Sequence, residues 1–352
     1  MLVYMFYRTV CCLCGSPLCE KLVLEKYPLK FSPTEEDHEK DEYCDFKYGS
    51  CVGCGSLQLM TLVPQHILYD TSHNGTSHSP LWASHHKEFS RFIETSPTSN
   101  VIEVGGTGTI SIQNNYKILD FVDNGNPNFI KGNCEDYDFS YTDVIIMSHV
   151  FEHLYEPLKF VKNCKKFGVR SIFLSLPMMR ADANVICIHN EHTYFADKSD
   201  IISLFETNNY ILNKTNNFQE HSIFFNFILD LTAVPYHMII TPGRENIILE
   251  KFEGRRIRLE DVRVTNDNTY IMPAGHFGQM VYYYLKGRKP AGFIDNDISK
   301  QNKRVYGTPL IARSINELNP ETVLLYAGSY SEEIRVQINR VHPACNVITL
   351  SI

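Results

Sequence analysis

The chain lacks several features that mark common functional classes. Its 352 residues contain no uninterrupted apolar run that approaches the roughly 20 residues of a membrane span. Positive charge is also scarce, because the chain contains 33 Lys and Arg residues but 40 Asp and Glu residues, which gives a net charge of −7. A nucleic-acid-binding protein would carry a basic surface instead. The composition therefore favours a soluble globular protein that binds neither membranes nor nucleic acids.

A leader pattern and a disulfide framework are missing as well. Met1 to Tyr7 is apolar but has no basic flank and no cleavage site, so we predict a strand there. The 11 cysteines are odd in number, and four of them have metal-ligand spacing. This usage favours a reducing compartment over secretion. We expect a cytoplasmic protein that is a monomer or a weak homodimer.

Two Cys-x-x-Cys-Gly knuckles are the strongest motif present. Cys11 and Cys14 form the first pair, and Cys51 and Cys54 form the second. Two such pairs make a tetrahedral sulfur site that suits structural Zn²⁺ and leaves no open position for chemistry. Unrelated buried thiols are the alternative. Between the knuckles lies an acidic stretch, Glu35 to Glu42, which we interpret as a solvated loop.

The rest of the chain alternates buried strands with amphipathic helices, which is typical of an α/β fold. In the middle region we predict a helix through Phe89 and Phe92, strands at 101–104, 117–123, 143–147 and 171–176, and helices at 157–167 and 197–209. The tail repeats the pattern, with strands at 269–273, 292–295, 322–326 and 346–350. We therefore predict three domains: a small zinc-binding domain (1–64), a central Rossmann-like domain (65–240) and a C-terminal Rossmann-like α/β domain (241–352).

A glycine-rich turn follows the strand that ends at Val104. A Rossmann-like sheet binds ligands at such a turn, where glycine permits close backbone approach. An acid at the end of the next strand could accept hydrogen bonds from ribose hydroxyls, although an exposed turn residue is an equal alternative. The candidate binding residues here are Glu103, Gly105, Gly106, Gly108, Asp120 and Asp123.

Two histidine-containing strings follow the next two strands. His149 and His153 lie in a turn with a glutamate, where side chains face the crevice of such a sheet. His189, Glu191 and His192 form the second string, and a histidine beside a carboxylate suits proton transfer at neutral pH. Its spacing is not the i, i+4 of a helical zinc motif, so a metal is disfavoured. A surface loop remains the alternative.

In the tail, Gly275 and His276 open a predicted helix. Pro273 stands where the dinucleotide fingerprint has its first glycine, so we do not expect nicotinamide chemistry. Binding of a phosphate group at the start of this helix is the alternative that the sequence allows.

Together these strings resemble the three-domain, S-adenosylmethionine (SAM)-dependent C-methyltransferases that act on nucleotide-linked deoxysugars in bacteria. The resemblance covers nearly the whole chain. Its markers are the two knuckles with Leu57-Gln58-Leu59 and Tyr27-Pro28-Leu29, the glycine turn, Phe151-Glu-His-Leu154, Glu191-His192 with Tyr194-Phe195, Gly275-His-Phe-Gly278, Phe293-Ile-Asp295 and Gly307-Thr-Pro309.

The resemblance implies a SAM-dependent methyltransferase domain at 65–240 and a nucleotide sugar bound in the cleft among the domains. A base removes the proton beside the ketone of a 4-keto sugar, and the enolate attacks the methyl group. His192 is then the base, Glu191 tunes it, and His189 has a less secure role. His149 joins the cofactor residues, and the substrate residues are Tyr27, His153, Tyr194, Gly275 and His276.

The cofactor turn departs from the family pattern. Thr107 and Thr109 occupy positions where glycine is usual, and only seven residues separate Gly108 from Tyr116, too few for a helix with its loops. A non-catalytic sugar-nucleotide-binding or scaffold protein with the same fold is therefore the alternative.

Overall fold

The computed structural model describes residues 5–30, 33–69, 80–106, 110, 115–123, 125–177, 190–219, 221–234, 248–250, 253–254, 262, 264, 267–285, 289–327 and 331–350. The chain divides into two compact units, each made from segments separated in sequence. The first contains residues 1–22, 47–183 and 190–245, and the second contains 23–46, 184–189 and 246–352. The domain boundaries drawn from the sequence stay a prediction.

Short antiparallel strands accompany the two knuckles. β1 (Phe6–Tyr7) pairs with β6 (Thr61–Leu62). A four-stranded sheet has the order β12-β5-β4-β2, formed by β2 (Leu18–Pro28), β4 (Tyr43–Cys51), β5 (Leu57–Leu59) and β12 (Tyr194–Phe195). Because Tyr194 lies opposite Gln58, this sheet fixes a segment that is distant in sequence.

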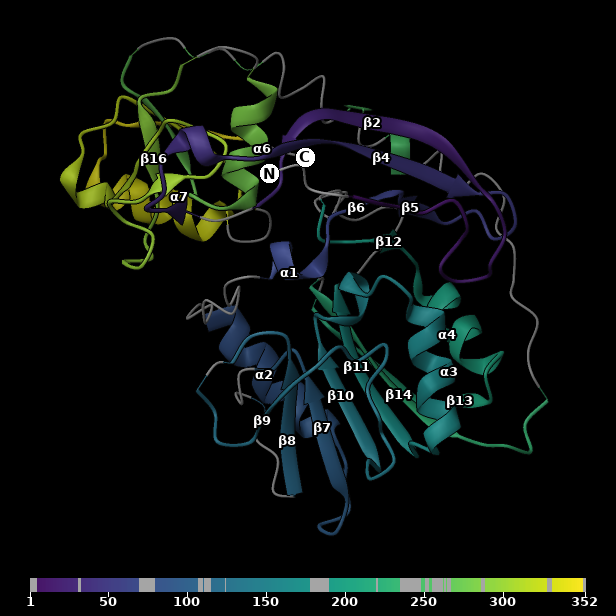
Figure 1. Ribbon diagram of the computed structural model, residues 1–352. Helices are drawn as coiled ribbons and strands as arrows, with labels where there is room; N and C mark the ends of the chain where they lie inside the picture. Colours follow the sequence, from purple (N-terminus) through teal and green to yellow (C-terminus); the bar gives the residue numbers. More distant parts are fainter. Residues whose placement is uncertain are drawn as a thin grey trace. The chain divides into compact units, whose positions relative to one another are not determined.

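A seven-stranded sheet forms the centre of the first unit (Figure 1). Its strands are β7 (Asn100–Val104), β8 (Asn115–Asp120), β9 (Phe129–Lys131), β10 (Val144–Ser148), β11 (Ser171–Pro177), β13 (Tyr210–Phe218) and β14 (Ser222–Leu229). Their order is β13-β14-β11-β10-β7-β8-β9, and β14 runs antiparallel to both neighbours. The order reverses between β7 and β10, which makes their carboxyl ends the switch point of the sheet. The predicted Rossmann-like sheet is confirmed.

Helices cover both faces of this sheet, as Figure 1 shows. Alternate residues of β10 point to opposite faces, so Ile145 and Met147 share a core with Phe160 of α3 (Pro157–Phe167). α4 (Lys198–Glu206) packs on that face too. Val144 and Ile146 instead share a core with Phe89 of α2 (Pro80–Phe92) on the other face. The short elements α1 (Gln65–Leu68) and η2 (Phe151–His153) complete the unit's described helices.

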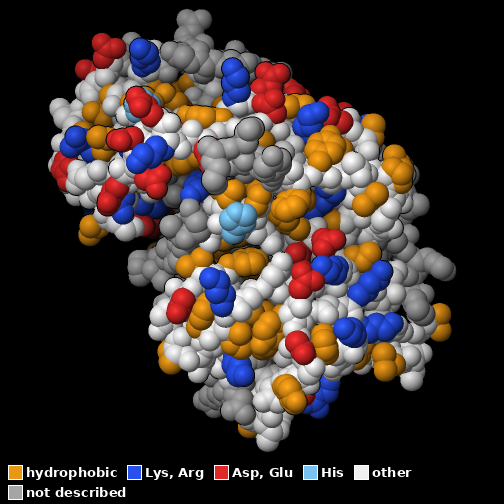
Figure 2. Space-filling model, viewed as in Figure 1, with side chains coloured by type: hydrophobic (Ala, Val, Ile, Leu, Met, Phe, Trp, Pro, Cys, Tyr) orange, Lys and Arg blue, Asp and Glu red, His pale blue; other side chains and the backbone are white. Residues whose placement is uncertain are grey.

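Among the described helices, none combines the length and the hydropathy needed to cross a bilayer. On the face drawn in Figure 2, Lys and Arg side chains intermingle with Asp and Glu side chains. Charges of both signs are what a water-exposed surface commonly carries.

The second unit contains a five-stranded parallel sheet of order β18-β16-β15-β19-β20. Its strands are β15 (Thr269–Met272), β16 (Gly292–Ile294), β18 (Ala312–Arg313), β19 (Thr322–Leu325) and β20 (Asn346–Thr349), with helices α6 (His276–Tyr284), η4 (Ile315–Glu317) and α7 (Ser331–Val341). The order again reverses beside the first strand, between β15 and β19. The predicted second Rossmann-like sheet is therefore confirmed.

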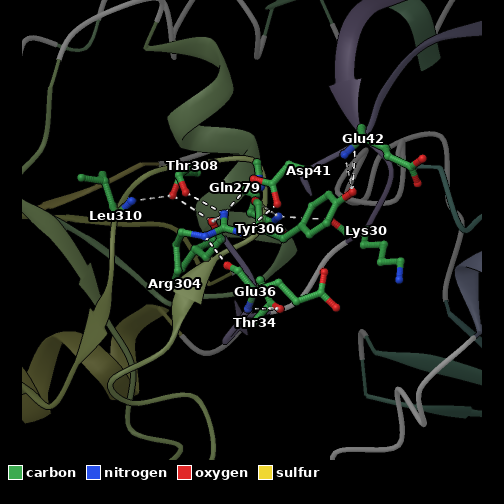
Figure 3. Close-up of polar contacts among 12 residues, drawn as sticks. Lys30, Thr34, Glu36, Asp41, Glu42, Gln279, Arg304, Tyr306, Thr308 and Leu310 are labelled. Carbon is green, nitrogen blue, oxygen red and sulfur yellow. Dashed lines mark hydrogen bonds and ion pairs between the residues drawn. The ribbon is translucent and has the colours of Figure 1, made fainter. Parts of the chain in front are cut away.

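The acidic stretch is not simply a solvated loop, and that interpretation is wrong for Asp41. Within the second unit, β3 (Pro33–Thr34) pairs with β17 (Arg304–Val305), and η1 (His38–Lys40) follows. The Asp41 carboxylate accepts two hydrogen bonds of 2.7 Å from the Arg304 guanidinium (Figure 3). Their side chains are 1% and 11% exposed, so this ion pair is buried. The Arg304 Nε also donates to the Glu36 carbonyl.

Replacing Arg304 with methionine should lower the free energy of unfolding of the second unit by about 3 kcal/mol, because Asp41 would stay buried without its partner. The neighbouring Lys303 pairs with Glu35 at 3.6 Å, and that carboxylate is 81% exposed. Lys303→Met is therefore a matched control that should cost less than about 1 kcal/mol. Denaturant titration of the three proteins measures the difference, and equal losses in both variants would contradict the prediction.

Candidate functional site

The four knuckle cysteines come together as the sequence predicts. The Sγ atoms of Cys11 and Cys54 are 3.6 Å apart, and those of Cys14 and Cys51 are 3.4 Å apart. Zn–S bonds of 2.3 Å in a tetrahedron place sulfurs about 3.8 Å apart, so the spacing suits zinc. We call this group the cysteine cage (Cys11, Cys14, Cys51 and Cys54).

Local backbone geometry explains why each knuckle ends in glycine. Gly15 and Gly55 have φ values of +78° and +75°, a conformation that glycine adopts without steric cost. The Gly15 N–H donates to the Cys11 carbonyl, and the Gly55 N–H donates to the Cys51 carbonyl. The N–H groups of Gly53 and Cys54 also point at the Cys51 sulfur, both at 3.3 Å. These donors favour a charged thiolate.

The cage is also connected to a segment of the first unit that is distant in sequence. The buried Gln58 side chain donates to the Cys11 sulfur over 2.8 Å, while its backbone pairs with Tyr194 in β12. The Arg8 guanidinium, also buried, donates to the Thr193 carbonyl over 2.7 Å. Gln58, which contacts the cage, and Arg8 therefore both bind the segment of residues 193–195, which directly follows Glu191 and His192.

At the switch point, the glycine turn after β7 closely approaches the segment after β10. Gly105 has φ of +66°, and a Cβ there would lie 2.6 Å from the Val150 side chain. A Cβ on Gly106 would overlap the Glu103 carboxyl group, which accepts a hydrogen bond from the Tyr116 hydroxyl. Gly105 is therefore required by its backbone conformation and by this contact, whereas a Cβ at Gly106 would displace only the flexible end of the Glu103 side chain. Gly108 lies outside the described residues.

The two acidic candidates, Asp120 and Asp123, lie at different positions relative to strand β8. Asp120 is the last residue of β8 and is partly buried at the same sheet edge. Asp123 lies beyond the strand, which ends three residues earlier than predicted, and its exposed carboxylate accepts from the Gly125 N–H. Asp123 thus has the geometry of the exposed turn residue that the sequence left as an alternative.

His149 follows β10 directly and has φ of +54°, which is uncommon for a residue other than glycine. Its Nε2 lies 2.8 Å from the Ser222 hydroxyl, and its Nδ1 lies 3.6 Å from Glu152. Burial and neighbouring histidines hold the pKa of His149 well below 6.5, and burial raises the pKa of Glu152 to about 8. Both groups are then neutral near pH 7, so this contact is not an ion pair.

Several buried polar atoms at this edge have no hydrogen-bond partner among the described residues. They are the Ser148 hydroxyl oxygen and both carboxyl oxygens of Glu152. Buried polar atoms are rarely left unsatisfied, so such atoms usually mark a ligand or water site. The end of β10 is therefore a candidate binding site.

The proposed base lies beside this edge. The ring of His192, which is 8% exposed, packs edge-on against that of His153, with centroids 4.9 Å apart. The His153 Nδ1 is 3.2 Å from the Tyr69 hydroxyl. Burial, with Glu191 as the next cause, raises the pKa of Tyr69, so this hydroxyl is neutral. The structure thus brings His192, Glu191 and His153 together with Tyr69, while His189 lies outside the described residues.

A pocket of about 350 Å³, its open mouth included, lies at the carboxyl end of β11. It is mostly apolar, and Glu152 reaches its wall. The other lining residues are Leu176, Pro177, Tyr194, Ala196, Asp197, Lys198, Ile201, Ile223 and Phe225. Tyr194 contributes its ring, since its hydroxyl donates to the Phe151 carbonyl over 2.7 Å.

The remaining substrate candidates belong to the second unit. Tyr27 is 2% exposed and packs on Tyr283 and Phe46, so its ring is part of a core. Gly275 is the N-cap of α6 and His276 is its first residue, beside the switch point of the second sheet. Burial lowers the pKa of His276 to about 4, with Lys300 as a further cause.

Sequence reasoning missed several residues of the first-unit site. Tyr69 lies outside the motifs, as do His85 and His221, the neighbours that lower the pKa of His149, and Glu152 drew attention only as a neighbour of histidines. Tyr69 ends a short helix and His221 lies in a turn, where neither periodicity nor spacing carries a signal. Only the fold brings them to the sheet edge.

Comparison with solved structures finds partial matches to methyltransferases. Magnesium protoporphyrin IX methyltransferase from Synechocystis with bound SAH is 13% identical, matches 43% of this chain and 84% of its own, and gives a TM-score of 0.34. A SAM-dependent methyltransferase from Aquifex aeolicus is 15% identical, with 42% and 88% covered and a TM-score of 0.31. One from Mesorhizobium loti is 6% identical, with 40% and 96% covered and a TM-score of 0.34. At these values the matches indicate neither a substrate nor a site residue for this chain.

No protein-family model matches the sequence, and no curated protein matches it.

Proposed function

We propose that this protein is a SAM-dependent methyltransferase that C-methylates a nucleotide-linked 4-keto deoxysugar and carries one structural zinc. One observation carries the proposal: at the switch point of a seven-stranded sheet, a glycine turn meets buried polar atoms that have no hydrogen-bond partner among the described residues. The substrate class is supported by the sequence resemblance alone.

The residues at the switch point fit a SAM molecule. Gly105 keeps the turn free of a side chain, and Asp120 lies where ribose hydroxyls can donate to a carboxylate. Ser148 and Glu152 offer polar atoms that lack partners among the described residues. When bound, SAM supplies an electrophilic methyl group on its sulfonium.

His192 is the proposed base that takes the proton from the carbon beside the ketone. A neutral imidazole can accept this proton, and Glu191 beside it in the chain can stabilise the imidazolium that forms. Tyr69 and His153 are candidates to hydrogen-bond the enolate oxygen, because they form one bonded group against His192. The proton thus moves to His192 and the negative charge moves to an oxygen that these groups face.

The pocket beside Glu152 is our candidate for the sugar. Its mostly apolar lining suits a deoxysugar, which has fewer hydroxyls to satisfy than a fully hydroxylated sugar. Small-molecule partners, cytoplasmic location and a monomeric or weakly dimeric state remain parts of the proposal.

Calorimetric titration with SAM tests the enzyme proposal. We expect micromolar binding, and we expect Gly105→Ala to weaken it at least about tenfold, because the new Cβ forces the turn away from Val150. Gly168→Ala is the matched control. Gly168 has a similar φ of +71°, caps α3, and would place a Cβ with nothing within 4 Å.

The control should lose stability but keep SAM affinity. No binding of millimolar SAM to the wild-type protein would end the enzyme proposal and leave the sugar-nucleotide-binding or scaffold alternative. Thermal protection by a panel of nucleotide sugars then tests that alternative directly.

A further inference from the structure

Three histidines from distant parts of the first unit converge beside the end of β10. His85 comes from α2, His149 follows β10, and His221 lies in the turn between β13 and β14. Each offers one ring nitrogen, and the three nitrogens lie within 4.8 Å of one another. We call this group the histidine triad (His85, His149 and His221).

Serine hydroxyls orient all three rings. The Nε2 of His85 lies 2.8 Å from the Ser175 hydroxyl. The Nε2 of His149 and the Nδ1 of His221 lie 2.8 Å and 2.5 Å from the Ser222 hydroxyl. Histidines that bind metals are oriented in this way, since a hydrogen bond at one ring nitrogen fixes the direction of the other.

His85 supplies the strongest sign of a missing ligand. Its side chain is fully buried, and its Nδ1 has no hydrogen-bond partner among the described residues. Buried polar nitrogens are seldom left unsatisfied in folded proteins, so this atom points to a ligand at the triad. A cation coordinated by the triad would satisfy it.

Trp82 covers the triad with an apolar surface. Its ring centroid lies 5.0 Å from that of His85, 4.8 Å from His149 and 4.9 Å from His221. Apolar cover limits the access of water and strengthens coordination by the rings beneath it.

We propose that the histidine triad binds one divalent transition-metal cation of the zinc class. Imidazole nitrogens suit Zn²⁺, Co²⁺, Ni²⁺ and Cu²⁺ and do not suit Mg²⁺ or Ca²⁺. Three protein ligands leave a fourth tetrahedral position for water or for a ligand oxygen. This site is separate from the cysteine cage, and its existence does not depend on the methyltransferase proposal.

A second group, Glu152 with His153 and His192, also has ligand atoms within 4.8 Å of one another. We favour the triad because serine hydroxyls orient all three of its rings and because the Trp82 ring packs against each of them. The experiment must therefore separate the two groups.

Trp82 makes that experiment specific, because it is the only tryptophan in the chain. The full-length protein, with its cysteine cage filled by one equivalent of zinc, is titrated with Co²⁺ while tryptophan fluorescence is followed. Bound Co²⁺ is paramagnetic and quenches an adjacent indole. We expect saturable quenching at one further equivalent, reversed by excess Zn²⁺.

Removing one ligand should abolish this binding. We expect His221→Ala to raise the quenching midpoint by ~100-fold or more, beyond the loss typical of an outer-sphere change. His86→Ala is the matched control, since His86 lies on the same helix, 5.5 Å from the Trp82 ring centroid, but outside the triad. It should leave the midpoint unchanged. If thermal melting shows that His221→Ala does not fold, His85→Gln takes its place.

Three outcomes would overturn the proposal. The wild-type protein could show no saturable quenching, or the His221→Ala midpoint could equal that of the wild type. Quenching lost in His153→Ala but retained in His221→Ala would assign the cation to the Glu152 group instead. None of these outcomes depends on SAM binding or turnover, so failure here is distinguishable from failure of the proposed function.

Discussion

Replacing Cys51 with serine is expected to release the zinc from the cysteine cage and to unfold the amino-terminal part of the first unit. Structural zinc sites contribute about 10–16 kcal/mol of binding free energy in small modules, as much as the whole stability of a typical domain, about 5–15 kcal/mol. Cys51 is 4% exposed and its sulfur accepts two backbone N–H groups. Serine does not replace it as a ligand, because zinc binds the thiolate and a serine hydroxyl stays protonated.

The loss should spread to the candidate active site. Gln58 connects the Cys11 sulfur to β12, so loosening the cage should free the segment that carries Glu191 and His192. Metal analysis should find one zinc fewer per chain, and limited proteolysis should cut the variant within residues 5–69 and near residue 193. Both measurements are made on freshly purified protein.

Cys19→Ser is the matched control. Cys19 belongs to β2, is exposed, and lies outside the cage. This variant should keep its zinc and its resistance to protease. Equal zinc content in wild-type and Cys51→Ser proteins would show that the cage does not hold the metal.

The parts of the fold that the sequence predicts well are those with local signals. The knuckles need only residues a few positions apart, and the helix at 157–167 is α3 to the residue because its apolar stripe, its starting proline and Gly168 at φ of +71° all agree. The predicted helix at 197–209 corresponds to α4, which starts at Lys198 with Asp197 as its N-cap, in a capping box with Asp200, and ends at Glu206. Helix ends fray, so a difference of a few residues at the carboxyl end is small.

Strands β13 and β14 were not predicted, and their positions explain why. β13 is the edge strand of its sheet and carries Asn213, Lys214, Thr215 and Asn216, so no apolar alternation marks it. β14 is buried on both faces and reads as a continuous apolar run, which does not distinguish a strand from a buried helix. Both segments are strands because they pair with neighbouring strands of the sheet, which the local sequence does not show.

The roles of charged and polar site residues are likewise not predictable from local sequence. Asp41 reads as part of a solvated acidic run because its partner, Arg304, lies 263 residues away in sequence. His85 and His221 likewise acquire meaning only through tertiary contacts with His149. A single sequence contains the residues of such sites but not the distances among them.

Replacing His192 with alanine is expected to lower turnover about 10³-fold while leaving SAM affinity unchanged. General-base catalysis typically contributes 10²–10⁴-fold, so a loss of about 4 kcal/mol of transition-state stabilisation should follow. His66→Ala is the control, since His66 lies on α1 but is exposed. It should keep full activity.

Exchange of the substrate's own proton separates a base from a residue that only supports the fold. In D₂O without SAM, the wild-type protein should exchange the hydrogen beside the ketone of a nucleotide-linked 4-keto deoxysugar, as followed by proton NMR. His192→Ala should lose this exchange, because no other imidazole takes its place: the other ring against it, His153, is already engaged with the Tyr69 hydroxyl. Exchange at the wild-type rate would remove His192 as the base, whereas lost exchange with intact SAM binding assigns it the proton-transfer step.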